Sequence, residues 1–274
     1  MNFGLTGEVL MVTGGGSGIG RQTALMAAEQ GAHVAVCDVN AAGADRVCED
    51  ILKTGGRARA FAFDVTDIDA TENAVDEIEA VFGPISGLVA AAGISRPSLA
   101  EAMPIETWSN VIAVNLTGVF LSCQAVGRRM IPRGAGSIVA IASANALGGH
   151  PGRAHYCASK YGVVGLVKTL AIEWGRHGVR VNATAPGAVE TPMLRNGLPA
   201  AFIDQVMMDR TPMKRLATAT DQALACLFLL SKAASFVNGI LLPVDGGATG
   251  GYLTHRNGAD YSSNALAAAG AYDP

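Results

Sequence analysis

Two side chains that could exchange and stabilise a proton lie four residues apart in the segment H-Y-C-A-S-K-Y-G-V-V-G, residues 155–165. Tyr156 and Lys160 occupy positions i and i+4, so a helix would place both on one face. A phenol has an unperturbed pKa of about 10, and a neighbouring ammonium lowers that pKa because it favours the phenolate. The pair therefore suits a general acid/base. An ordinary surface pair is the alternative, although the small and apolar residues around it indicate a closely packed helix.

A third polar side chain, Ser143, ends the apolar run S-I-V-A-I-A-S, 13 residues before Tyr156. The run predicts a buried strand, and ligands of open α/β sheets bind at the carboxyl ends of the strands. The Ser143 hydroxyl could hydrogen-bond a substrate oxygen, or it could only cap a turn. No G-x-S-x-G elbow surrounds it, which disfavours a nucleophilic serine of the hydrolase type.

A glycine-rich loop follows the first apolar run in V-L-M-V-T-G-G-G-S-G-I-G, residues 9–20. Between a strand and a helix, this pattern is typical of dinucleotide binding. Gly14 would permit the tight turn, Gly18 the approach of phosphate oxygens, and Gly20 the packing of helix against strand. The helix N-terminus would then face a pyrophosphate. A tight turn without a ligand is the alternative.

Two carboxylates end later strand candidates. Asp38, 18 residues beyond Gly20, could accept hydrogen bonds from ribose hydroxyls and would repel a 2′-phosphate. Neither Val39 nor Asn40 supplies a cation, so the sequence favours NAD over NADP. Asp38 could also be a simple strand-end cap. Asp64 suits the adenine amino group, or it is a solvated loop carboxylate.

Strand and helix patterns alternate along the chain, which predicts an α/β fold: a Rossmann-like, doubly wound parallel sheet of about seven strands in a single domain. The strands are expected at Val9–Thr13, His33–Cys37, Arg59–Phe63, Gly87–Ala91, Ser137–Ala142, Val179–Ala185 and Ile240–Val244. The helices are expected at Gly20–Gln30, Ala41–Thr54, Asp67–Phe82, Glu106–Met130, Tyr156–His177 and Thr220–Leu230. The domain would span residues 1–247. Residues 248–274 form a C-terminal extension in which we expect no strand.

Composition narrows the class of partner. The 274 residues are 50% hydrophobic and only 16% charged, against a usual charged share of about 25%. The net charge is −3 and no basic run occurs, which argues against nucleic acid or an anionic membrane and favours a small molecule. No apolar run approaches a membrane span of about 18 residues or more. The five cysteines show no C-x-x-C spacing, so we expect no metal site, no disulfide framework and a cytoplasmic location.

From about Leu5 to Gly247 the chain resembles the short-chain dehydrogenase/reductase family. The motifs that carry the resemblance are T-G-G-G-S-G-I-G, Asp38, Val114-Asn115, Ser143, Y-C-A-S-K, Pro186-Gly187 and a late D-G-G. The resemblance implies that Tyr156 exchanges a proton with the substrate oxygen, which Ser143 orients. Lys160 would bind the nicotinamide ribose and lower the Tyr156 pKa, and Asn115 would hold a water in a proton relay.

The resemblance also implies further cofactor contacts and a homotetramer. The segment P-G-A-V-E-T, residues 186–191, would border the nicotinamide. Where the family often has N-N-A-G, this chain has Ala90-Ala91-Ala92-Gly93, so only backbone contacts with the adenosine ribose are expected there. The implied contacts with the cofactor are Gly14, Ser17, Gly18, Ile19, Gly20, Asp38, Val39, Asp64, Val65, Ala90, Gly93, Tyr156, Lys160, Pro186, Gly187, Val189 and Thr191.

The substrate side is less well defined. Residues 191–208 lie where the family carries a lid, and their apolar residues, Met193, Leu194, Leu198, Phe202, Val206 and Met207, would line the pocket or pack on their own domain. The candidate substrate contacts are Asn145, His150, Arg153 and Met193. We expect a secondary alcohol or ketone as substrate. A non-catalytic NAD-binding sensor or scaffold and an NAD-dependent epimerase or dehydratase are the alternatives. We hypothesise that residues 248–274 dock on a neighbouring subunit.

Overall fold

Seven parallel strands form one sheet in the order β3-β2-β1-β4-β5-β6-β7, in a computed structural model that describes residues 2–197, 199–251, 255–256 and 259–260. The strands are β1 (Val9–Thr13), β2 (His33–Asp38), β3 (Arg57–Ala62), β4 (Gly87–Ala90), β5 (Gly136–Ile141), β6 (Val179–Pro186) and β7 (Leu241–Val244). The predicted doubly wound sheet is confirmed. The strand order reverses between β1 and β4, where such folds bind ligands.

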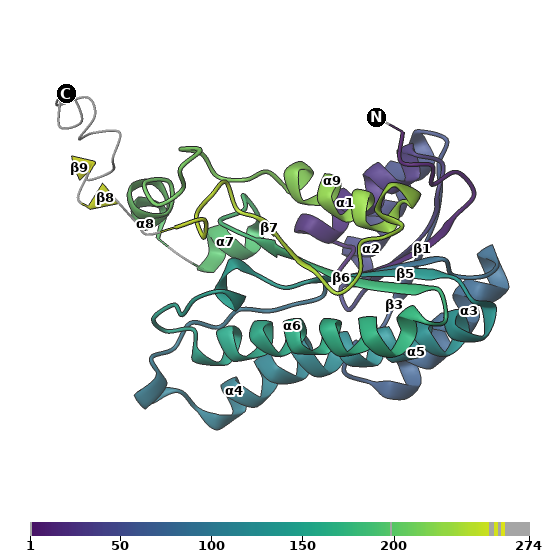
Figure 1. Ribbon diagram of the computed structural model, residues 1–274, viewed down its shortest axis with the longest axis horizontal. Helices are drawn as coiled ribbons and strands as arrows, with labels where there is room; N and C mark the ends of the chain where they lie inside the picture. Colours follow the sequence, from purple (N-terminus) through teal and green to yellow (C-terminus); the bar gives the residue numbers. More distant parts are fainter. Residues whose placement is uncertain (1, 198, 252–254, 257–258, 261–274) are drawn as a thin grey trace.

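Helices cover both faces of the sheet (Figure 1). The longer ones are α1 (Gly18–Glu29), α2 (Ala41–Lys53), α3 (Ile68–Phe82), α4 (Ile105–Ile112), α5 (Gly118–Arg133), α6 (Ala154–Gly175) and α9 (Ala219–Leu230). The short ones are α7 (Pro192–Gly197), α8 (Ala200–Phe202), the 3-10 turns η1 (Ala100–Ala102), η3 (Ala144–Ala146) and η5 (Lys232–Ala234), and the π-turns η2 (Ala113–Thr117) and η4 (Ile203–Met207).

Successive residues of each strand point to opposite faces of the sheet and pack in different hydrophobic clusters. Val9 and Met11 of β1 pack in a cluster with α3, α5 and α6, whereas Leu10 and Val12 pack in a second cluster with α1, α2 and α9. This alternation is the two-residue period of a strand whose faces are both buried. It explains why the strand segments read as continuous apolar runs.

The single helix expected over Glu106–Met130 is instead α4, η2 and α5 in sequence. The Gly118 amide bonds to the Ala113 carbonyl, which is the five-residue spacing of a π-turn. Residues Ile105–Arg133 together are long and apolar enough to cross a membrane by length and composition, contrary to the expectation from the sequence. The apolar window is 56% buried inside the fold, so packing against the sheet accounts for its composition.

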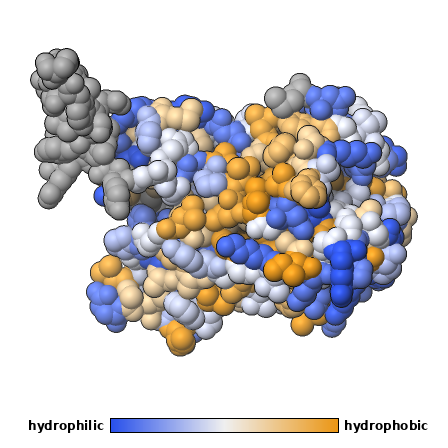
Figure 2. Space-filling view, in the orientation of Figure 1, coloured by the Kyte–Doolittle hydropathy of each residue, from blue (hydrophilic) through white to orange (hydrophobic). Residues whose placement is uncertain are grey.

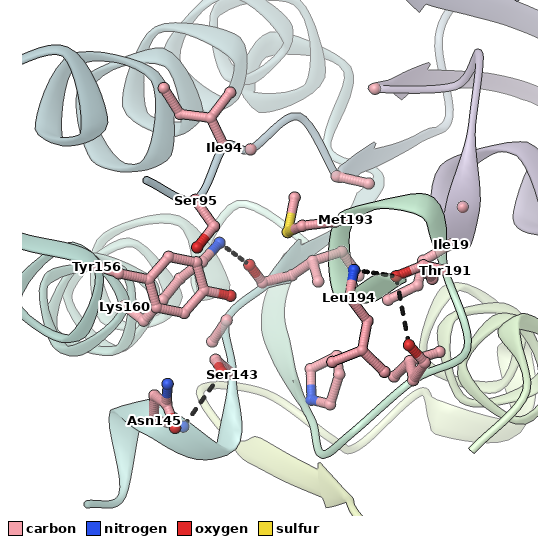
Figure 3. Close-up of a pocket in the computed structure, with 18 of the residues that line it drawn as sticks. Ile19, Ile94, Ser95, Ser143, Asn145, Tyr156, Lys160, Thr191, Met193 and Leu194 are labelled. Carbon is pink, nitrogen blue, oxygen red and sulfur yellow. Dashed lines mark hydrogen bonds between the residues drawn. The ribbon is translucent and has the colours of Figure 1, made fainter. Parts of the chain in front are cut away.

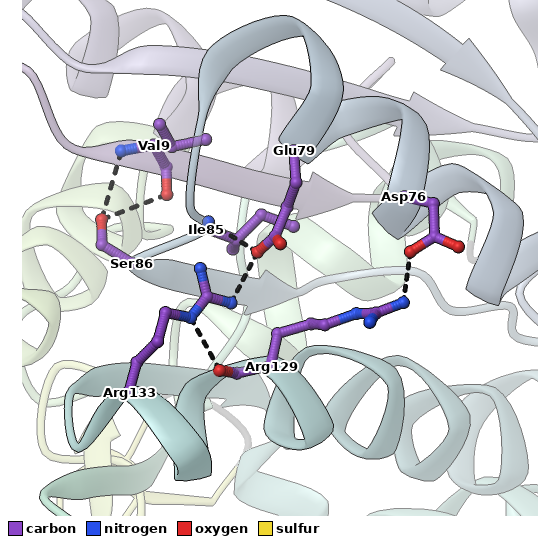
Figure 4. Close-up of polar contacts among 7 residues, drawn as sticks. All are labelled: Val9, Asp76, Glu79, Ile85, Ser86, Arg129 and Arg133. Atoms are coloured by element: carbon purple, nitrogen blue, oxygen red, sulfur yellow. Dashed lines mark hydrogen bonds and ion pairs between the residues drawn. The ribbon is translucent and has the colours of Figure 1, made fainter.

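Polar side chains fix α3 against α5 on the outer layer (Figure 4). Arg133 donates to Glu79 at 2.6 Å, and Glu79 also accepts from the Ile85 amide at 3.0 Å. Arg129 pairs with Asp76 one turn earlier. Exposed pairs of this kind contribute about 0–1 kcal/mol each, so they set the helix register more than they stabilise it.

Hydrophobic side chains remain exposed on one face of the molecule. Figure 2 shows a hydrophobic band over α9 and β7. Leu224 and Phe228 of α9 are each 36% exposed, and Phe236 is fully exposed.

The C-terminal extension contains a short antiparallel pair, β8 (His255–Arg256) and β9 (Ala259–Asp260), so the expectation of no strand there is wrong. Residues 252–254, 257–258 and 261–274 of the extension lie outside the described residues. Docking on a neighbouring subunit therefore stays a prediction.

Candidate active site

A cleft of about 530 Å³ lies at the carboxyl ends of the strands. It is lined by the glycine loop at one end and by Ser143, Tyr156 and Lys160 at the other. All the predicted cofactor and substrate contacts line it except Ala90, and of the four catalytic candidates only Asn115 does not.

The glycine loop has the geometry that a dinucleotide needs. A Cβ added to Gly20 would lie 2.2 Å from the Gly14 carbonyl oxygen, so a side chain there would force the turn away from α1. Gly14 itself has φ +65, and its Cβ would lie 2.7 Å from the Ala92 amide. Gly18 has φ +52, a left-handed conformation that side chains rarely adopt.

The N-terminus of α1 lacks both of the protein groups that usually neutralise such an end. Its N-cap, Ser17, makes no side-chain capping bond, and the first turn contains no acidic residue. The free amides and the positive end of the helix dipole are therefore left for an anion. This arrangement fits a dinucleotide pyrophosphate.

Asp38, at the end of β2, is hydrogen-bonded to the glycine loop. Its Oδ2 accepts from the Gly16 amide at 2.9 Å, and its Oδ1 accepts from the Asn40 amide at 2.9 Å. Each carboxylate oxygen has a further lone pair for a ligand hydroxyl. Asp64 is held differently, because its Oδ1 accepts from both the amide and the hydroxyl of Thr66. Both carboxylates border the cleft.

Ala90 does not face the cleft. It is buried among the core residues at the end of β4, and the next residues, Ala91 and Ala92, line the cleft instead. The Ala91 amide donates to the Thr13 carbonyl at 3.1 Å. The Ala90 side chain therefore does not border the cleft, and the expected backbone contact with the cofactor stays a prediction.

Ser143, Tyr156 and Lys160 converge from β5 and α6 (Figure 3). Ser143 follows β5 and caps η3, where its Oγ accepts from the Asn145 amide at 3.1 Å. Lys160 Nζ lies 5.7 Å from the centre of the Tyr156 ring and donates to the Ile141 carbonyl at 2.7 Å. The helical spacing read from the sequence thus places phenol and ammonium on one face of α6.

The pKa of Tyr156 is raised by burial, and two groups act against this shift. The side-chain hydrogen bond with Ser143 lowers the pKa most, and the charge of Arg153 lowers it further. Lys160 was expected to provide this lowering and does not in this structure. The reason is geometric, because its ammonium is drawn to the Ile141 carbonyl, and its own pKa is lowered to about 8 by burial.

Asn115 is fully buried within the π-turn η2. Its Oδ1 accepts from the Ile94 amide at 2.8 Å, and its Nδ2 donates to the Ile94 carbonyl at 2.9 Å and the Ser159 hydroxyl at 3.4 Å. These contacts hold the loop after β4, and the expected role of Asn115 in a proton relay stays a prediction. The π-turn places Asn115 opposite that loop.

His155 also holds this loop and was missed in the sequence. Its ring is fully buried, with Nε2 2.7 Å from the Arg96 carbonyl and Nδ1 2.8 Å from the Tyr156 amide. Because an amide N–H only donates, Nδ1 is the acceptor and Nε2 carries the proton. His155 thereby ties the loop to the first turn of α6, next to the phenol.

The far side of the cleft is formed by the lid segment, residues 191–208. The Thr191 hydroxyl donates to the Val189 carbonyl and accepts from the Leu194 amide, both at 3.3 Å (Figure 3). A Cβ on Gly18 would lie 3.5 Å from the Thr191 methyl group, so the lid begins against the glycine loop. Residue 198 lies outside the described residues, while the other predicted apolar lid residues border the cleft.

The candidate substrate contacts Asn145, His150, Arg153 and Met193 all line the cleft. Ser95 and Arg210 lie there too and carried no motif in the sequence. Ser95 comes from the loop that Asn115 and His155 hold, and its Oγ is buried without a partner among the described residues.

The sheet order and the glycine loop define a doubly wound nucleotide-binding protein, and the comparisons with known proteins give its family. Residues 14–249 match the family model described as Enoyl-(Acyl carrier protein) reductase. The chain belongs to the short-chain dehydrogenase/reductase family.

Relatives with different substrates share most of the chain. D-threitol dehydrogenase of Mycolicibacterium smegmatis is 42% identical, over 90% of this chain and 95% of that protein. Galactitol 2-dehydrogenase (L-tagatose-forming) of Cereibacter sphaeroides is 43% identical, over 90% and 97%. The crystal structure of a gluconate 5-dehydrogenase from Burkholderia cenocepacia, in complex with NADP and tartrate, is 38% identical with a TM-score of 0.87, over 92% of this chain and 98% of that chain.

Proposed function

We propose that this protein is an NAD-dependent oxidoreductase that interconverts a secondary alcohol and the corresponding ketone. The observation that carries the proposal is the convergence of Ser143, Tyr156 and Lys160 on a cleft whose opposite end is an uncapped helix N-terminus. The names of the relatives, which are dehydrogenases of threitol and galactitol, support the same reaction type.

The positions of the cleft residues allow each of them a specific role in this reaction. A bound dinucleotide would accept a hydride when the alcohol is oxidised and donate one when the ketone is reduced. Tyr156 takes the hydroxyl proton during oxidation and returns it during reduction, while Ser143 hydrogen-bonds the same substrate oxygen. Lys160, buried beside the phenol, binds the cofactor ribose, while Ser143 and Arg153 favour the phenolate. Asn115 and His155 position the loop that faces these groups.

Cofactor choice rests on Asp38. Its carboxylate is fixed by two backbone amides at the cleft rim, and the neighbouring Val39 is 73% exposed and carries no charge. A 2′-phosphate would meet a negative charge there, so we propose NAD. Because a relative is described in complex with NADP, this choice needs a direct test.

The test is a panel of secondary alcohols and ketones assayed with NAD and with NADP by the absorbance of the reduced cofactor. Tyr156→Phe is expected to lower kcat by about 10²- to 10⁴-fold, because the acid/base is lost while the ring remains. Turnover by this variant at the wild-type rate would contradict the mechanism. Cofactor binding without any turnover would favour the sensor or scaffold, and conversion of a sugar nucleotide without net oxidation would favour the epimerase.

Asp38→Ala is expected to raise kcat/KM with NADP relative to NAD, because the repulsion of the 2′-phosphate is removed. The ratio of the two kcat/KM values measures the preference directly. An unchanged ratio would mean that Asp38 does not select the cofactor.

We further propose a cytoplasmic homotetramer. All five cysteines are free, which supports a reducing compartment. The exposed side chains of α9 and Phe236 support burial against another copy of the chain. Light scattering at micromolar concentration tests this, and a monomer mass would refute it.

A further inference from the structure

An arginine without a carboxylate partner lies beside the phenol. Arg153 precedes α6, is half-buried, and has its Cζ 6.0 Å from the centre of the Tyr156 ring. Its guanidinium borders the cleft. Among the described residues it makes no hydrogen bond and no ion pair, and its backbone alone bonds to His150 and Cys157.

The loss of hydration outweighs the attraction of the neighbouring side chains for this charge. Burial of the guanidinium lowers the pKa of Arg153 more than the neighbouring Tyr156 and Cys157 side chains raise it. Glu190, just before the lid, is held by Arg195 through two hydrogen bonds of 2.6 Å and 2.5 Å. The cleft wall opposite is apolar, formed by Met193, Leu194, Phe202, Val206 and Met207. A half-buried cation among apolar groups indicates that an anion binds there.

Arg153 and the glycine loop lie at opposite ends of α7. Thr191, just before α7, lies beside the glycine loop, because a Cβ added to Gly18 would lie 3.5 Å from the Thr191 methyl group. At the other end of α7, a Cβ on Gly197 would lie 3.9 Å from Arg153 Nη2. Arg153 therefore faces the substrate end of the cleft, next to the proton-exchanging phenol.

We propose that Arg153 binds a carboxylate of the substrate, so that the substrate is a hydroxy acid or the corresponding oxo acid. The proposal rests on the proposed function and names the substrate class of the same site. A guanidinium binds a carboxylate through two parallel hydrogen bonds, which would fix the carbinol carbon relative to Tyr156. The carboxylate is bound and released unchanged, so the reaction needs no further reactant.

A second polar group supports a substrate with several oxygens. The buried Ser95 hydroxyl has no partner among the described residues and points toward Lys160 and Tyr156 (Figure 3). A further hydroxyl of the substrate would satisfy it, because a buried polar group without a partner is costly. A carboxylate is favoured over a phosphate, since Arg153 is the one half-buried guanidinium among the described cleft residues and Arg210 is exposed.

The test compares hydroxy acids that differ in the distance between hydroxyl and carboxylate, each beside its own primary amide and a matched phosphate monoester. The variants are Arg153→Gln, Arg210→Gln and Lys168→Gln. Lys168 is an exposed cation of the same helix α6, and Lys168→Gln is the matched control for loss of charge. Because Arg153 also lowers the Tyr156 pKa, Arg153→Gln changes kcat for acid and amide alike. The ratio of their kcat/KM values isolates anion binding.

We expect the wild-type enzyme to prefer acid to amide, and Arg153→Gln to lower that ratio by about 30-fold, within roughly 10- to 100-fold. Lys168→Gln should leave the ratio unchanged. An unchanged ratio in Arg153→Gln, a loss caused only by Arg210→Gln, or a preference for the phosphate ester would each overturn the proposal.

A binding measurement separates this proposal from the proposed function. With NAD present, benzoate should raise the melting temperature of the wild type and not that of Arg153→Gln. If no alcohol is oxidised but this difference is found, the carboxylate site stands and the proposed function fails. If neutral alcohols are oxidised and benzoate stabilises both proteins equally or neither, the carboxylate site alone is refuted.

Discussion

Replacing Lys160 with methionine should stabilise the folded chain at neutral pH while it abolishes turnover. Lys160 is 4% exposed, and burial lowers the pKa of its ammonium from 10.5 to about 8. Below pH 8 the folded chain therefore holds a charge that the unfolded chain holds in water at lower cost. Methionine has a similar length and no charge.

The magnitude follows from that pKa. A shift from 10.5 to about 8 corresponds to about 3 kcal/mol at roughly 1.4 kcal/mol for each pKa unit. The variant loses the hydrogen bond to the Ile141 carbonyl, which costs about 1 kcal/mol. The net gain at pH 7 is about 2 kcal/mol, or roughly 4–8 °C in melting temperature for a chain of this size.

The stabilisation by Lys160→Met should decrease as pH rises. Since the folded pKa lies below the unfolded one, the unfolded chain binds more protons between pH 8 and 10.5, and the stability of the wild type rises with pH in that window. The advantage of Lys160→Met should be full below pH 8 and should disappear as pH approaches 10.5.

The assay is urea unfolding of the cofactor-free protein at several pH values from 7 to 10.5. Lys168→Met, an exposed position of the same helix, is the control and should change the free energy of unfolding by less than about 0.5 kcal/mol. If Lys160→Met is less stable than the wild type at pH 7, or its advantage does not depend on pH, the buried charge does not have the cost assigned to it.

Two further substitutions test the phenol and the glycine loop. Ser143→Ala should move the rising limb of the pH–rate profile for alcohol oxidation to higher pH, because the hydrogen bond that lowers the Tyr156 pKa is lost; an unmoved limb would contradict this. Gly20→Ala should weaken cofactor binding by about tenfold or more and destabilise the fold by about 1–3 kcal/mol, because its Cβ would meet the Gly14 carbonyl at 2.2 Å. Gly165→Ala is the control, since nothing lies within 4 Å of its Cβ and alanine favours a helix; it should stabilise by about 0.5–1 kcal/mol. Equal cofactor affinity and stability in both glycine variants, by calorimetry and thermal unfolding, would argue against a steric role for Gly20.

The parts of the site that were predictable depend on local rules. Tyr156 and Lys160 share a face because of helical periodicity, and Ser143 joins them because parallel strands end at a common edge. The glycine loop was recognisable because its conformations are open to few other residues. In each case the local sequence and the order of the strands and helices determine where the residue lies in the fold.

The parts that were missed depend on contacts between distant segments. The side chain of Ala90 faces the core rather than the cleft because strand ends are uncertain by a residue, and successive residues face opposite sides. The position of Asn115 depends on a π-turn that periodicity does not reveal, and its partner Ile94 is 21 residues away. The hydrogen bond from Lys160 to the Ile141 carbonyl joins residues 19 positions apart, and no motif reveals it.

The lid segment has few anchors, and this has a consequence for how the protein can diversify. Between residues 191 and 211, of the side chains whose burial is described, only Ile203 and Thr211 are buried. Substitutions along the rest of the lid therefore change the wall of the substrate cleft with little effect on the free energy of unfolding, which resides in the two cores. A lineage can sample new substrates here by single mutations, without first acquiring compensating changes in the sheet.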